Sequence, residues 1–87
     1  MHEMSLFKGL LNKIEAVSRE NEGKNIVKLK VKLGALAHIS HSHFREHFDL
    51  LSQGTAAEGA VLEIEQDQDQ NDPLAQEIIL ESVEMEI

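Results

Sequence analysis

The stretch Asn25–Gly34 constrains the fold of this 87-residue chain more than any other part of the sequence. Apolar residues alternate with lysines along it, so an extended segment would be apolar on one side and charged on the other. This period of two predicts a half-buried strand whose lysine side is a solvated face. The apolar members are Val27, Leu29, Val31 and Leu33, and the lysines are Lys28, Lys30 and Lys32.

A strand with one apolar side needs a cover, and two amphipathic helices are predicted to supply it. From Met4 to Val17, apolar residues recur at steps of three and four, the pattern of a helix with one buried side. Gly9 lies inside this helix, and we expect another backbone to approach it closely there. The second helix is predicted over about Ser40–Ser52, and its apolar stripe is Phe44, Phe48 and Leu51.

Two more strands complete the predicted sheet. One covers Ala60–Glu65, and the other runs from about Ile78 to Ile87, with Ile87 among its inward-facing residues. Glu81 breaks the alternation of this last strand, which predicts a β-bulge or a strand end there. The order helix, strand, helix, strand, strand predicts one α+β domain over residues 1–87. Two helices would pack on one face of a three-stranded sheet and form two layers.

Composition excludes several classes of function. The chain has no cysteine, which rules out disulfides, zinc ribbons and thiol nucleophiles. Its formal net charge is −8, and residues 58–87 hold ten acidic residues and no lysine or arginine. Binding to nucleic acid or anionic membranes needs clustered basic residues, so neither is expected as a partner, whereas a cation is. Because no signal segment or long apolar run is present, a soluble cytoplasmic protein is expected.

Two familiar motifs match only superficially. His43–His47 fits the H-x-x-E-H pattern of some zinc peptidases, but a chain this small has no room for a distant third ligand and a substrate cleft. Asp67–Asp72 begins like a calcium loop, yet the positions that need glycine and glutamate hold Asp72 and Ile78. The sequence offers no glycine-rich phosphate loop and no serine beside an orienting acid. The chain is therefore not expected to be an enzyme.

The first three residues combine several potential metal ligands. If the chain starts at Met1, its amine, the backbone nitrogen of His2 and the His2 ring can close fused chelate rings on one ion. Glu3 can add an oxygen. Such nitrogen donors suit a borderline metal such as nickel, copper or zinc. The alternative interpretation is an ordinary exposed chain end.

Four of the five histidines lie between Ala37 and His47. His38 and His41 are the better ligand candidates of this group, because they are expected to be more exposed. His43 and His47 lie one helical turn apart and could both reach one ion. We favour them instead as half-buried packing residues beside the apolar stripe. A histidine-based metal buffer is an alternative interpretation of the whole cluster.

Several segments resemble one known family. Met1–Leu6 (MHEMSL) resembles the M-H-E-x-S-L start of the HypA/HybF family of nickel-insertion accessory proteins for hydrogenase and urease. Gly54–Glu65 (GTAAEGAVLEIE) is similar to that family's G-T-x-A-E-G-A-x-L-E-I-E segment. Three more segments resemble parts of the same family. Lys28–Gly34 (KLKVKLG) resembles its first strand, Phe44–Asp49 (FREHFD) its second helix, and Leu80–Glu86 (LESVEME) its last strand.

The resemblance implies a nickel metallochaperone rather than an enzyme, with nickel held by the Met1 amine, His2 and Glu3. It implies two protein partners, a maturation GTPase and a hydrogenase large subunit. The family also carries a zinc module with paired C-x-x-C motifs between its last two strands. Here residues 66–77 stand in its place as a short polar linker, so no structural zinc is expected. The chain is either a naturally minimal paralogue or a shortened form of a longer protein.

The sequence departs from the family at two more positions. Some members carry an acidic residue where this chain has Ala35 or Ser40. His38 and His41 lie close by and could substitute as ligands. A function of another class also stays open, namely a metal-independent interaction module that uses a helix face or the acidic C-terminal half.

Overall fold

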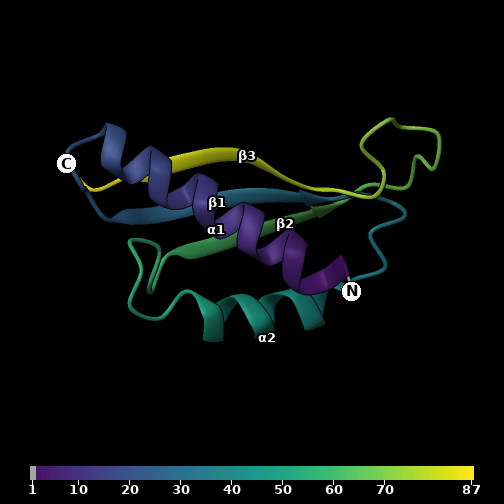
Figure 1. The fold of residues 1–87 in the computed structure, drawn as a ribbon, viewed down its shortest axis with the longest axis horizontal. Helices are drawn as coiled ribbons and strands as arrows, with labels where there is room; N and C mark the ends of the chain where they lie inside the picture. The colour runs from purple at the N-terminus through teal and green to yellow at the C-terminus, as the bar shows by residue number, and fades with distance from the viewer. Residues whose placement is uncertain (1) are drawn as a thin grey trace.

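A computed structural model describes the backbone of residues 2–87 and the side chains of residues 5–87. Its elements are α1 (His2–Glu20), β1 (Ile26–Leu33), α2 (His41–Leu51), β2 (Val61–Gln66) and β3 (Ile78–Met85). The sheet order is β2-β1-β3, with β1 parallel to β2 and antiparallel to β3. Both helices lie on one face of the sheet, and α2 is the crossover that two parallel strands require (Figure 1). The predicted α+β class and element order are confirmed.

The alternation along β1 separates a buried face from a charged one, as predicted. The lysines lie on the open face, where each pairs with carboxylates of neighbouring segments. Lys28 Nζ lies 3.2 Å from Glu63 Oε2, and Lys30 Nζ lies 3.5 Å from Glu65 Oε1. Exposed pairs of this kind each contribute about 0–1 kcal/mol, so the buried face carries most of the stability. Its fully buried members on β1 are Leu29, Val31 and Leu33.

Two register shifts between β1 and β3 decide which residues face inward. One shift skips Glu81 on β3, which confirms the predicted bulge. The other turns Ile26 inward and leaves Val27 46% exposed, so the inward position predicted for Val27 is wrong. The prediction for Ile87 is also wrong, because this residue lies beyond the end of β3 and is fully exposed.

Both predicted helices are present, and they contact each other as well as the sheet. The first extends beyond the predicted range at both ends. The second is capped by Ser40, whose side chain accepts a hydrogen bond from the His43 backbone N–H at 3.2 Å. Phe7 of α1 stacks on Phe44 of α2, with ring centroids 4.9 Å apart. Among the residues that the structure describes, no helix is long and apolar enough to cross a membrane.

Gly34 marks the closest approach of two main chains. A Cβ added there would lie 2.1 Å from the carbonyl oxygen of Ala75. The Gly34 N–H donates to the Glu77 carbonyl at 2.9 Å, and the Leu36 N–H donates to the Ala75 carbonyl at 2.7 Å. These bonds tie the loop after β1 to the segment before β3. The close approach predicted at Gly9 is wrong, because an added Cβ there would meet nothing within 4 Å.

The segment between β2 and β3 is folded on itself by aspartate side chains. Lys32 of β1 joins its two halves, because its Nζ lies 3.6 Å from Asp67 Oδ2 and 3.8 Å from Asp72 Oδ2. Three aspartates also accept hydrogen bonds from backbone N–H groups two residues ahead, in the manner of Asx turns. These pairs are Asp67 with Asp69, Asp69 with Asn71 and Asp72 with Leu74.

The pKa of the Asp67 carboxyl is expected to depend on its contact with Lys32. The backbone N–H of Asp69 holds the pKa of Asp67 below its usual range, and the charge of Lys32 lowers that pKa further. Folding lowers the pKa of Asp67, so the ionised carboxylate stabilises the folded state at pH values above the ordinary carboxyl pKa. This contribution to the free energy of unfolding is lost as the pH falls through the pKa that Asp67 has in the folded protein. In Lys32→Met we expect the NMR titration midpoint of Asp67 to move up, whereas in Lys30→Met it should stay. An unchanged midpoint in Lys32→Met would contradict the contact.

Candidate metal site

The predicted terminal ligands, namely the Met1 amine and the side chains of His2 and Glu3, lie outside the described residues. Helix α1 begins at His2. The first four N–H groups of a helix have no acceptor within the helix. The backbone nitrogen of His2 is therefore not committed to a helical hydrogen bond, and using it as a metal ligand would not break α1.

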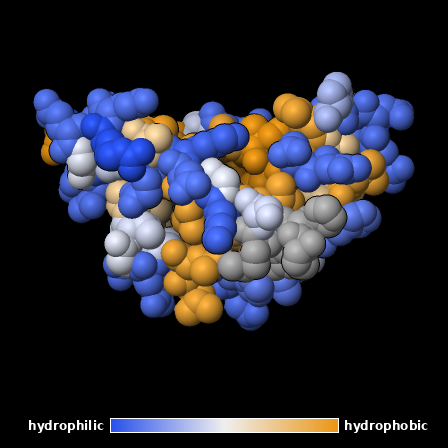
Figure 2. All heavy atoms as spheres, in the orientation of Figure 1, coloured by the Kyte–Doolittle hydropathy of each residue, from blue (hydrophilic) through white to orange (hydrophobic). Residues whose placement is uncertain are grey.

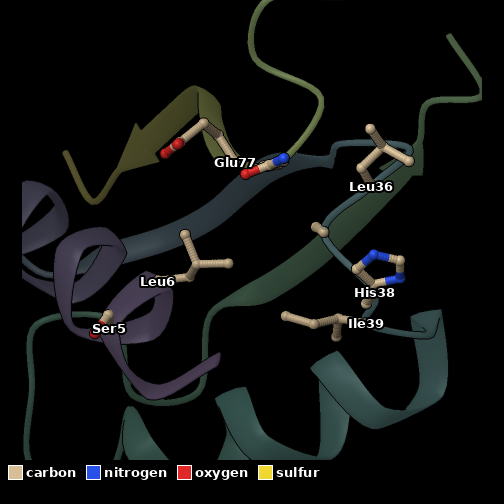
Figure 3. A pocket seen from close by; sticks show the side chains of 8 residues that line it. Ser5, Leu6, Leu36, His38, Ile39 and Glu77 are labelled. Atoms are coloured by element: carbon tan, nitrogen blue, oxygen red, sulfur yellow. The ribbon is translucent and has the colours of Figure 1, made fainter. Parts of the chain in front are cut away.

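A hollow of about 440 Å³ lies at the end of the molecule where α1 begins. Ser5 and Leu6, three and four residues after His2 on α1, line one side of it, and His38 lines another (Figure 3). The backbone of His38 is left-handed, with φ of 60°, which is uncommon for a residue other than glycine. His41 is exposed at the first residue of α2 and is not among the described residues that line the hollow.

The hollow is lined by four apolar and four polar residues. On the face of the molecule seen in Figure 2, polar residues cover most of the surface, and one of the apolar areas lies between α1 and β3. An apolar shell limits the access of water to a nearby metal site and strengthens its electrostatic interactions. The apolar lining residues are Leu6, Leu36, Ala37 and Ile39, and the polar ones are Ser5, His38, Gln76 and Glu77.

The histidines of α2 lie beside the start of α1. The ring of His47 stacks on Phe7 of α1, with centroids 5.8 Å apart, and the ring of His43 lies 4.2 Å from that of His47. His47 is half-buried, as predicted for a packing residue. The same prediction for His43 is wrong, because His43 is exposed. His43 lies on the first turn of α2 and directly precedes the buried Phe44.

Among the side chains from Ser5 onward, no three histidine, aspartate or glutamate residues are grouped closely enough to hold a metal ion. His38 and His41 are both exposed, as predicted for ligand candidates. The structure brings His38, but not His41, to the hollow next to α1. His43 and His47 have ring centroids 4.2 Å apart, and the sequence-based choice of ligands passed over this pair in favour of His38 and His41.

The second motif behind the resemblance, GTAAEG, has a structural role. Its two glycines have φ of 79°, a left-handed conformation that glycine adopts without strain. The Thr55 hydroxyl donates to the Ser52 carbonyl at 2.6 Å, and the Glu58 carboxylate accepts from the Gly54 N–H at 2.9 Å. The Glu15 carboxylate of α1 accepts from the Ala56 N–H at 3.3 Å. The motif therefore forms the connection between α2 and β2.

Together these features define a two-layer α+β domain that gathers histidines at the end where its first helix begins. Comparison with known proteins identifies the family to which this domain belongs. The family model described as hydrogenase/urease nickel incorporation, metallochaperone, HypA matches residues 1–72. The chain belongs to the HypA family.

Curated relatives carry the name hydrogenase maturation factor HypA. The one from Acidithiobacillus ferrooxidans is 42% identical over 64 residues, which cover 74% of this chain and 57% of the relative. Those from Desulfitobacterium hafniense and Aquifex aeolicus are 38% and 37% identical over 65 and 67 residues, covering 75% of this chain and 57% and 58% of the relatives. The chain thus spans somewhat more than half the length of the relatives it matches.

Proposed function

We propose that this chain is a nickel-binding delivery domain, in which the Met1 amine, His2 and Glu3 hold Ni(II) for transfer to a nickel enzyme. The observation that carries the proposal is the family match, which begins at these ligands and extends to residue 72. The helix start at His2 supports it, because the backbone nitrogen there has no helical partner. Two nitrogens of the backbone and one of the ring favour a square-planar Ni(II) site.

His38 is proposed as an additional ligand near this terminal site. It lines the same hollow as Ser5 and Leu6, which lie one helical turn after His2. Hydrogen bonds from the Gly34 and Leu36 N–H groups hold its loop against the segment before β3. Imidazole is a common ligand of nickel, so His38 can take a position that the terminal ligands leave open.

The relatives' printed name, hydrogenase maturation factor, supports a NiFe hydrogenase as the enzyme that receives the metal. The large subunit of that enzyme and a maturation GTPase are the protein partners proposed for delivery. We also propose that residues 66–77 replace a longer module and that the domain works without structural zinc. The family match ends inside this segment, and the chain has no cysteine to bind zinc.

Residues added ahead of Met1 are expected to lower the Ni(II) affinity by about tenfold or more, since the terminal amine moves away from the site. Calorimetry at mildly alkaline pH measures the effect, because the ligands must be deprotonated to bind. The matched control carries the same tag after Ile87, at the opposite end of the molecule (Figure 1). If both tagged proteins bind as tightly as the untagged one, the amine is not a ligand.

A further inference from the structure

The imidazole rings of His43 and His47 lie side by side on α2. The two residues are one helical turn apart, and their ring centroids lie 4.2 Å from each other with planes at 30°. Metal–nitrogen bonds of about 2.1 Å place the centroids of two neighbouring imidazole ligands about 4.5 Å apart. The observed spacing is close to this value, and rotation of the rings about their side-chain bonds would aim one nitrogen of each at a shared ion. We propose that this pair is a second binding position for a borderline divalent ion such as Ni(II).

The pair lies next to the start of α1, and this inference deepens the proposed function at that end of the molecule. Phe7 contacts both Phe44 and His47, with centroid distances of 4.9 Å and 5.8 Å. Figure 1 shows α1 and α2 beginning at the same end of the sheet.

The pair supplies two ligands, and water or a terminal group would complete the coordination. Imidazole suits nickel, copper and zinc, so the site takes the class of ion that the terminal ligands take. Two ligands hold a metal less tightly than a fused chelate, which makes the pair an exchangeable position.

The inference is tested by titrating NiCl₂ into the full chain with NMR detection in a His2→Ala background, where the terminal site is impaired. The signals of His43 and His47 should still respond to nickel. Adding His43→Gln should lower this residual affinity by about tenfold or more, because a chelate becomes a single ligand. His41→Gln, which removes an exposed imidazole two residues away, should change it by less than about twofold. His43→Gln leaves the contact of His47 with Phe7 in place, so the fold should survive.

Each outcome separates the pair from the terminal site. If nickel perturbs neither α2 histidine in His2→Ala while the unaltered chain binds tightly, the pair is not a site and the terminal proposal stands. If His2→Ala binds as tightly as the unaltered chain and His43→Gln removes the binding, the pair stands and the terminal ligands fail. Equal losses in His41→Gln and His43→Gln would overturn the pairing of His43 with His47. His47→Gln, checked by circular dichroism for folding, should reproduce the loss seen in His43→Gln.

Discussion

His2→Ala is expected to lower the Ni(II) affinity of the untagged chain by about a hundredfold or more, equivalent to about 2.7 kcal/mol. The substitution removes the ring that closes the chelate on the terminal amine and leaves the amine, one backbone nitrogen and the Glu3 carboxylate. The fold should survive, because the buried core described from Ser5 onward has Phe7 as its first member. Isothermal titration calorimetry gives the affinity, and a thermal melt without nickel checks the fold.

The control for His2→Ala is His41→Gln, which also removes one exposed imidazole but does not touch the hollow beside α1. Its affinity should stay within about twofold of the unaltered chain. Equal affinities for all three proteins would show that the chain binds nickel elsewhere or binds it non-specifically. A loss in His2→Ala that accompanies unfolding would mean that the start of α1 has a structural role.

Gly34→Ala is expected to destabilise the domain by about 3 kcal/mol or more. The new Cβ would lie 2.1 Å from the Ala75 carbonyl oxygen, and backbone atoms cannot move aside as a flexible side chain can. Moving the two main chains apart to remove this clash would break the hydrogen bonds of Gly34 and Leu36 to the segment before β3. Urea unfolding measures the loss.

Gly9→Ala is the matched control for Gly34→Ala. Its Cβ would meet nothing within 4 Å, and alanine is favoured over glycine inside a helix by about 0.5–1 kcal/mol. Gly9→Ala should therefore be slightly more stable than the unaltered chain. A Gly34→Ala protein with unchanged stability would contradict the close packing of the loop after β1 on the segment before β3.

Much of the fold could be predicted from the sequence because the patterns that encode it are local. The alternation of Leu29, Val31 and Leu33 with lysines identified the central strand and its buried face. Glu81 marked a bulge because one charged residue interrupted a regular alternation. The inward turn of Ile26 could not be predicted in this way, since the register shift that causes it depends on pairing with β3, about sixty residues later.

The candidate site was only partly visible in the sequence. The terminal ligands could be named because they are adjacent in the chain, and the family resemblance pointed to the same residues. The hollow beside α1 could not be foreseen, because it forms where the loop around His38 is tied by main-chain bonds to the segment before β3. The spacing of His43 and His47 was evident, but their position relative to α1 depends on the packing of Phe7 against α2.

The most direct test is a titration of Ni(II) into the untagged full chain at mildly alkaline pH, followed by NMR. We expect the first equivalent of Ni(II) to shift the backbone NMR signals of the first turn of α1 and of the loop around His38. The signals of β2 and of the Lys28–Lys32 face should not shift. A chain that stays unperturbed throughout the titration, or that responds only outside these segments, would contradict nickel binding at the start of α1.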